Sequence, residues 1–243
     1  MSRGFSLLEL SISIVVIALI FGGILVGREM IQNSIVIKNA QQMIEIKRAA
    51  NEFMTIYNAV PGDFSAATRV WGSTWPDGVT DGDGDGLLGF PNSAGVLEHH
   101  EFWRQLAKAN LIRGNYCGHL CHSNGNALPW HPPTAITNGA YNAVRGGYYG
   151  IPDTNQLRVA RLLSAAPWWD GAFTPRDAKM ADVKFDDGIP SSGFITGVAA
   201  QSQPWSNCTT TNPTAGPSVG EYAINVQEVS CMVVMNLDEG QQP

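Results

Sequence analysis

The stretch that decides the fold lies at residues 5–26 and reads FSLLELSISIVVIALIFGGILV, with Glu9 as its one charged residue. As an α-helix it would be roughly 33 Å long, because each residue adds about 1.5 Å, and the apolar core of a bilayer is about 30 Å thick. These residues therefore predict a membrane-spanning helix. Arg3 precedes the stretch and no dense basic cluster follows it, so the positive-inside rule places Met1 in the cytoplasm and the rest of the chain outside.

Two simple interpretations of this helix fit poorly. A cleaved secretory signal has a shorter apolar region that is followed by a small-residue cleavage site. A plain single-pass anchor leaves Glu9 unexplained, because a carboxylate within the membrane costs at least about 2.5 kcal/mol and such residues usually have a functional partner.

The segment GFSLLE at residues 4–9 resembles the cleavage motif of type IV pilins and type II secretion pseudopilins. The resemblance implies that a prepilin peptidase cuts after Gly4 and methylates Phe5, and that Glu9 pairs with the terminal amine of a neighbouring subunit in a filament. An ammonium and a carboxylate that neutralise each other can stay in an apolar core, whereas either alone is penalised.

The same resemblance implies the partners and the location of the chain. The chain would contact other pilin-like subunits, the prepilin peptidase and an inner-membrane assembly platform. Before assembly it would also contact membrane lipid. The chain would cross the bacterial inner membrane once with a periplasmic head, and would then enter a periplasmic or extracellular filament.

The helix is expected to continue beyond the membrane, because residues 28–58 contain neither proline nor glycine. Apolar residues recur there at spacings of three and four, the pattern of one face of an amphipathic helix: Val36, Ala40, Met43, Ile46, Ala50, Phe53 and Tyr57. Pro61 and Gly62 then predict its end. The expected organisation is a leader at 1–4, a transmembrane or filament-core helix at 5–27, its amphipathic half at 28–58, and an extracytoplasmic head at 59–243.

The head contains one strong metal signal, at residues 77–90, which read DGVTDGDGDGLLGF. Asp81, Asp83 and Asp85 alternate with glycines, so their carboxylates can converge on one hard cation such as calcium. The match to an EF-hand then fails, because the twelfth position is Asn92 and no clear helix precedes the loop.

The remaining calcium ligands are expected nearby. The Leu87 carbonyl would take the backbone role, and Glu98 or Glu101 would close the shell. Secretion pseudopilins carry a calcium loop in the head, so the resemblance implies the same metal. The alternative is a flexible acidic loop without metal. The segment KFDDGIPSSG at 184–193 is interpreted as a simple turn. A second metal site at Asp186 and Asp187 is the less favoured alternative.

The four cysteines, Cys117, Cys121, Cys208 and Cys231, all lie in the part predicted to be extracytoplasmic, where disulfides persist. Four cysteines allow three pairings, of which we favour Cys117–Cys121 and Cys208–Cys231; the second would close a C-terminal loop, as in many pilins.

A less favoured alternative is a metal site in the segment CGHLCH at 117–122, where two cysteines and two histidines could hold zinc. A c-type haem requires C-x-x-C-H, but three residues separate these cysteines; His99, His100 or His131 could serve as its distal ligand.

Segments rich in β-branched and aromatic residues predict strands at 141–151, 157–163, 194–200, 222–226 and 229–235. Helices are expected at 94–112 and after Thr174-Pro175. The expected fold is α+β and pilin-like: a long N-terminal helix, membrane-spanning in its first half, packed on a small antiparallel sheet with a loop-rich head.

Composition and motifs exclude some classes of function. Fifteen basic against 21 acidic residues give a net charge of −6 without a basic run, which argues against nucleic-acid binding. The sequence carries no G-x-S-x-G, H-E-x-x-H or phosphate loop, so an enzyme is not expected. The alternative to a filament subunit is a membrane-anchored or filament-tip, adhesin-like binding module that uses the calcium loop and exposed tryptophans. The tryptophans are Trp71, Trp75, Trp103, Trp130, Trp168, Trp169 and Trp205.

Overall fold

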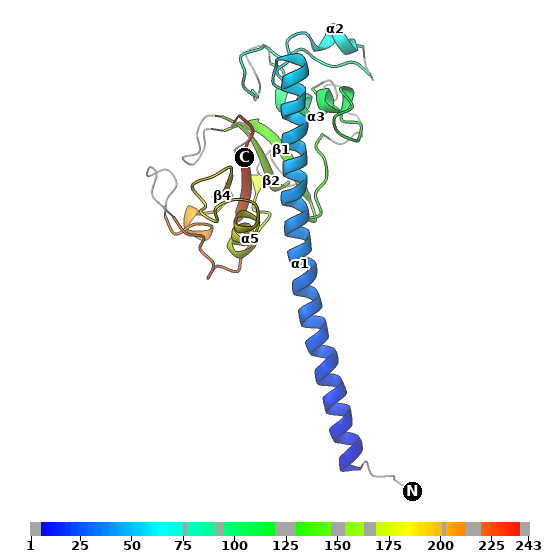
Figure 1. The fold of residues 1–243 in the computed structure, drawn as a ribbon, viewed down its shortest axis with the longest axis vertical. Coiled ribbons are helices and arrows are strands. Elements are labelled where there is room, and N and C mark those ends of the chain that lie inside the picture. Colours follow the sequence, from blue (N-terminus) through cyan, green and yellow to red (C-terminus); the bar gives the residue numbers. More distant parts are fainter. Residues whose placement is uncertain are drawn as a thin grey trace.

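The computed structural model describes residues 6–74, 77–89, 91, 95–119, 130–146, 154–162, 169–200, 203–211 and 220–238. One helix dominates it, α1 (Leu7–Tyr57), which is 51 residues long and continuous (Figure 1). Ser6 caps its start: the Ser6 hydroxyl accepts the Glu9 N–H at 3.2 Å, and the Glu9 carboxylate accepts the Ser6 N–H at 3.0 Å. The helix ends at Asn58, which adopts a left-handed conformation with φ 50°.

The two halves of α1 have different surroundings. Residues 7–26 are all exposed and project away from the head (Figure 1). The buried residues of the helix all lie in its second half: Val36, Asn39, Ala40, Met43, Ile46, Ala49, Ala50 and Phe53. The expected apolar face is thus buried, except that Tyr57 is only half-buried. By length and composition, α1 is the one helix among the described residues that is suited to cross a membrane.

The head contains an antiparallel sheet with the strand order β1-β2-β5-β4 and a short β3 beside β2. The strands are β1 (Gly139–Arg145), β2 (Asn155–Leu162), β3 (Trp169–Asp170), β4 (Ile195–Ala199) and β5 (Cys231–Asn236). The expected α+β class with a long N-terminal helix and a small antiparallel sheet is therefore confirmed. The predicted strand at 222–226 is wrong: Tyr222 makes a single bridge to Thr209, and the chain then turns, with the Val226 N–H bonded to the Ala223 carbonyl.

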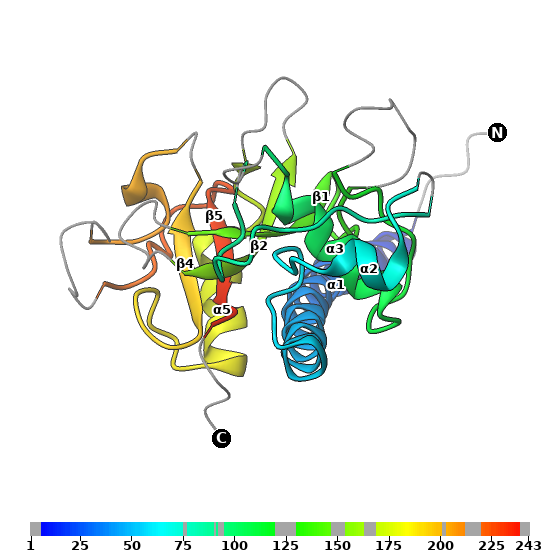
Figure 2. The same ribbon diagram turned by 90° about the horizontal axis from the view of Figure 1, so that it is seen from above.

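The helices of the head are α2 (Ala67–Trp71), α3 (Glu98–Lys108), α5 (Pro175–Phe185) and the 3-10 helix η1 (Trp205–Asn207). Helix α5 begins as its sequence predicts: the Thr174 hydroxyl accepts the Asp177 N–H, and proline occupies the first turn. Seen from above, α1 and α5 lie against the same face of the sheet (Figure 2). The Gln32 amide joins them by donating to the Asp177 carboxylate at 3.2 Å.

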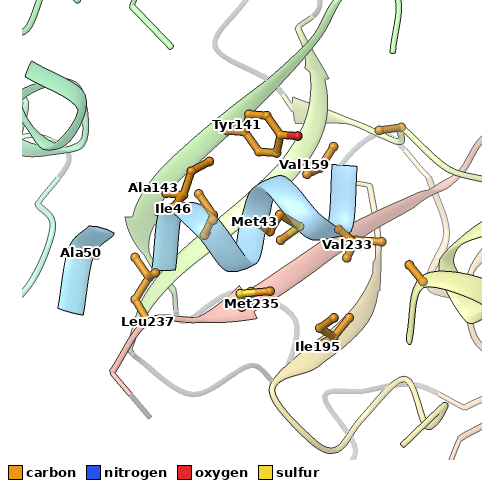
Figure 3. Packing of buried hydrophobic residues seen from close by; sticks show 14 of the residues in the cluster. Met43, Ile46, Ala50, Tyr141, Ala143, Val159, Ile195, Val233, Met235 and Leu237 are labelled. Carbon is orange, nitrogen blue, oxygen red and sulfur yellow. The ribbon is translucent and has the colours of Figure 1, made fainter. Parts of the chain in front are cut away.

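The core lies between α1 and the sheet. Met43 and Ile46 of α1 face residues contributed by four strands (Figure 3); the buried strand residues labelled there are Tyr141, Ala143, Val159, Ile195, Val233 and Met235. The Tyr141 hydroxyl makes polar contacts at the edge of this core, 2.7 Å from Gln42 Oε1 and 3.0 Å from Asn39 Oδ1. Because the strand residues come from four separate segments of the chain, the second half of α1 is the element that organises the head.

Candidate functional site

Helix α3 is the element that connects the loops of the head. Nine of its residues are buried, from Glu98 to Leu106, including charged ones. Helix α3 lies within the predicted helix at 94–112, and residues 98–106 are buried on every side of the helix. Buried polar side chains require hydrogen-bond partners, and here the surrounding loops supply them.

Three polar side chains of α3 hold the backbone of the surrounding loops. The Glu101 carboxylate accepts the His119 N–H at 2.7 Å, and burial raises the pKa of Glu101 to about 7. The Arg104 guanidinium donates to the carbonyls of Gly78 and Tyr116 at 2.5 and 2.6 Å. Gln105 Oε1 accepts the N–H of Gly62 at 2.6 Å, which secures the turn that follows α1. Helix α3 therefore organises the acidic loop and its neighbours.

Three carboxylates meet beside α3. One oxygen each of Asp63, Asp83 and Asp85 lies within 4.8 Å of the other two. Asp63 is only 2% exposed, and its two oxygens accept the N–H groups of Gly84 and Gly86 at 2.6 and 2.7 Å. Burial raises the pKa of Asp63, and the charges of Asp85 and Asp83 add to that effect. A cation between the three groups would relieve this repulsion.

Two other expected calcium ligands, the carboxylates of Asp81 and Glu98, accept hydrogen bonds from other groups. The Asp81 carboxylate accepts both the N–H and the hydroxyl of Thr68, each at 2.7 Å, and so lies outside the group. The Glu98 carboxylate, fully buried, accepts the N–H groups of Asp83 at 3.0 Å and Gly89 at 2.7 Å. The N–H of Leu87 donates to the Asp85 carboxylate at 2.8 Å, and its carbonyl stays a predicted ligand. Glu98 thus shapes the loop backbone, while Asp63, not expected from the sequence, joins the carboxylate group.

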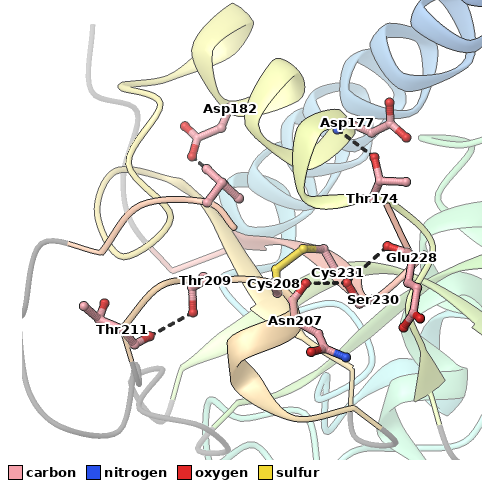
Figure 4. The surroundings of a disulfide bond; sticks show 11 residues. Thr174, Asp177, Asp182, Asn207, Cys208, Thr209, Thr211, Glu228, Ser230 and Cys231 are labelled. Carbon is pink, nitrogen blue, oxygen red and sulfur yellow. Dashed lines mark hydrogen bonds between the residues drawn. A yellow bond between two sulfur atoms is a disulfide. The ribbon is translucent and has the colours of Figure 1, made fainter. Parts of the chain in front are cut away.

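The disulfide of the C-terminal region joins Cys208, next to η1, to Cys231 at the start of β5, with Cα atoms 5.2 Å apart (Figure 4). This is the pairing that we favoured from the sequence. Cys117 is also disulfide-bonded, whereas Cys121 lies outside the described residues. Zinc binds the thiolate form of cysteine, so a disulfide-bonded Cys117 does not support the zinc interpretation of residues 117–122.

A second carboxylate group, of Asp182, Asp186 and Asp187, serves the turn after α5. Asp182 accepts the Tyr222 hydroxyl at 2.6 Å and the Gly188 N–H at 2.8 Å. Asp186 accepts the Ile195 N–H at 2.7 Å, and Asp187 the hydroxyl of a serine in the same turn at 2.6 Å. These bonds support the interpretation of residues 184–193 as a turn.

The Asp182 carboxyl predicts a pH-dependent stability. Burial raises its pKa to about 6, against about 3.9 in an unfolded chain. Between these values the folded chain binds a proton more readily, so lowering the pH through this range stabilises the fold through Asp182. We expect the free energy of unfolding of the parent chain to rise relative to that of Asp182→Asn between pH 7 and pH 4, by at most about 3 kcal/mol.

Urea unfolding of the two proteins at several pH values measures this difference. Subtracting the free energy of unfolding of the asparagine variant from that of the parent chain removes the contribution of the titrating groups that the two proteins share. A difference in stability that is the same at pH 4 and pH 7 would show that Asp182 does not titrate in this range.

Comparison with known proteins finds no relative of this chain. No protein-family model, no curated protein and no solved structure matches the chain. Its function is therefore inferred from its own residues and their arrangement.

Proposed function

We propose that this chain is a pilin-like subunit of a type IV pilus or a type II secretion pseudopilus. A prepilin peptidase processes it, and it assembles through α1 while calcium stabilises its head. One observation carries the proposal: the exposed apolar half of α1 begins within the GFSLLE segment and continues, without a break, into the half that organises the head.

The exposed half of α1 requires an apolar environment. Every large apolar residue between Leu7 and Val26 is at least 47% exposed. Apolar surface in water costs about 25 cal/mol per Å², so this helix favours lipid before assembly and the helices of other subunits after it. Its serine hydroxyls are already satisfied within the helix, since Ser11 donates to the Leu8 carbonyl and Ser13 to the Glu9 carbonyl.

The Glu9 carboxylate is the charged group of this apolar half. In the uncleaved chain it accepts the Ser6 N–H. Cleavage after Gly4 would create an ammonium group on Phe5, four residues before Glu9. Pairing this amine with Glu9 of a neighbouring subunit neutralises both charges and sets the axial register between subunits.

Calcium is the metal that suits the carboxylate group of the head. Asp63, Asp83 and Asp85 offer only hard oxygen donors, and their mutual repulsion, with Asp63 buried, favours a divalent cation. The bound ion would join the turn after α1 to the loop that Glu98 shapes, and so would stiffen the end of the head near α3.

The intact mass of the membrane-extracted protein tests the proposal. Co-expression with an active prepilin peptidase should remove Met1–Gly4 and add one methyl group. Replacing Gly4 with leucine should prevent cleavage, whereas Ser2→Ala, a change in the same leader, should leave it intact.

An unprocessed chain, beside a control prepilin that the same peptidase cleaves, would overturn the proposal. The chain would then be a membrane-anchored binding module. Trp130 and Trp205, which are 40% and 38% exposed, favour that alternative as contact residues for a ligand.

A further inference from the structure

Helix α5 directs its acidic and basic residues to different surroundings. Its five charged residues are Arg176, Asp177, Lys179, Asp182 and Lys184. Both aspartates are buried: the Asp177 carboxylate accepts the Gln32 amide. The Asp182 carboxylate accepts the Tyr222 hydroxyl. The three basic residues are exposed or partly exposed, so α5 presents only positive charge to its surroundings, in a chain with 21 acidic and 15 basic residues.

The start of α5 lies beside the end of the apolar half of α1. The Arg176 guanidinium is 3.4 Å from the Glu29 carboxylate. Glu29 follows Val26, the last residue of the apolar run, by three residues, or about 4.5 Å of helix. The headgroup layer of a bilayer is roughly 5–7 Å thick on each side of the apolar core. With residues 5–26 in that core, Arg176 therefore stands at the level of the lipid headgroups.

Helix α5 lies across α1. Figure 1 shows α1 along its length and α5 foreshortened, whereas Figure 2 shows α1 nearly end-on and α5 along its length. With α1 crossing a bilayer, α5 is thus roughly parallel to the membrane surface. Arg176 contacts Glu29, one turn nearer to the apolar half than Gln32, which binds Asp177. The side of α5 that carries Arg176 is therefore the side nearer to the membrane.

Two more residues share this side of α5. Lys179 and Val183 follow Arg176 by three and seven residues, the spacing of one helix face. Val183 is 59% exposed although it is apolar. Arg28, which is exposed on α1 two residues after Val26, adds a further positive charge at the same level. Basic groups beside an exposed apolar side chain are typical of a surface that lies on a membrane.

We propose that Arg176, Lys179 and Val183, the basic face of α5, bind the anionic headgroups of the membrane that α1 crosses. The head is then held on the lipid surface before assembly, by a contact separate from α1. The proposal rests on the membrane-spanning part of the proposed function and on no property of a filament.

Charge and tethering favour lipid as the occupant of this face. The ion pair with Glu29 uses one nitrogen of Arg176, whose side chain is 75% exposed, so the remaining N–H groups can donate to lipid phosphates. Each Lys or Arg near an anionic membrane contributes roughly a fivefold preference for its surface. Because α1 fixes α5 next to the headgroups, the contact forms within one molecule and at a high effective concentration of lipid.

The reactivity of Lys179 toward acetic anhydride tests the proposal, with the full chain in vesicles. Vesicles of phosphatidylcholine are neutral, and vesicles that also contain phosphatidylglycerol are anionic. At about 0.1 M salt we expect Lys179 to react at least about fivefold more slowly in the anionic vesicles, and at about 1 M salt the difference should shrink. Mass spectrometry of peptides measures the rates.

Lys38 is the internal reference for these rates. It is exposed and lies about 18 Å beyond Val26 along α1, further than the Debye length of about 10 Å at about 0.1 M salt. Its rate should therefore be the same in both kinds of vesicle. Arg176→Gln should remove most of the protection of Lys179. Arg48→Gln, the same substitution at an exposed position of α1 still further from the membrane, should leave that protection unchanged.

The possible outcomes separate the proposals. Equal reactivity of Lys179 in the two kinds of vesicle would overturn this inference, and so would protection that survives Arg176→Gln. Protection that rises with the ratio of protein to lipid, and not with phosphatidylglycerol, would assign the face to a second copy of the chain. Loss of the chain in an alkaline carbonate wash would show that α1 does not span the bilayer and would also overturn the inference. A chain that the prepilin peptidase leaves unprocessed would overturn the filament proposal without changing the reactivity of Lys179.

Discussion

Replacing Phe53 with alanine is expected to lower the free energy of unfolding of the head by about 3–5 kcal/mol. Phe53 is fully buried near the end of α1, where its ring lies 4.5 Å from that of Tyr57 and 6.2 Å from those of Phe64 and Trp71. The substitution removes a large apolar side chain and leaves a cavity that these aromatic rings can fill only in part. Urea unfolding of the full chain in detergent, followed by tryptophan fluorescence, measures the loss.

Ile56→Ala is the matched control on the same helix. Ile56 lies three residues further along α1 and is 58% exposed, so its truncation should change the free energy of unfolding by no more than about 0.5 kcal/mol. Equal losses in the two variants would mean that the end of α1 does not pack on the head in the way described.

Replacing Asp63 with asparagine is expected to abolish most of the stabilisation by calcium. Calcium at a hundred times its dissociation constant should raise the free energy of unfolding of the parent chain by about 2.7 kcal/mol. Asparagine preserves the shape of the side chain but removes the buried charge, and it offers one oxygen where the carboxylate offers two, to Gly84 and Gly86. Thermal unfolding with calcium and with a chelator separates the response to metal from the change in basal stability.

Asp81→Asn is the discriminating control for this prediction. The sequence predicts Asp81 as a calcium ligand, whereas in the structure its carboxylate accepts two bonds from Thr68. We therefore expect Asp81→Asn to lower stability by similar amounts with and without calcium. The reverse outcome is a loss of the stabilisation by calcium in Asp81→Asn and its full retention in Asp63→Asn. That result would mean that calcium binds the ligands expected from the sequence.

The long helix could be predicted from sequence because its signals are local. The apolar run at 5–26, the absence of helix-breaking residues at 28–58 and the turn at Pro61 each act over a few neighbouring residues. The same holds for the start of α5 at Thr174, where the capping hydroxyl lies three residues from the N–H that it binds. Four of the five predicted strands overlap strands of the sheet for the same reason.

Local sequence signals do not predict which three aspartates lie together beside α3. Asp63 lies some twenty residues before Asp83 and stands in a turn that sequence reasoning interprets only as the end of a helix. Its one local signal, a carboxylate directly after Pro61-Gly62, does not indicate a partner. Asp81 has the alternating spacing that favours a calcium ligand, but in the structure its carboxylate accepts a hydrogen bond from the Thr68 N–H.

The amino-acid sequence by itself determined where the long helix runs, which half of it is apolar all round and which face of the other half is buried. Those properties follow from periodicity along the chain. Only the tertiary structure decided which carboxylates meet, that α3 is buried with its charges satisfied by loops, and that Asp177 of α5 lies against Gln32 of α1. Those contacts join residues far apart in sequence, and they depend on how loops close around a core rather than on the preferences of any single segment.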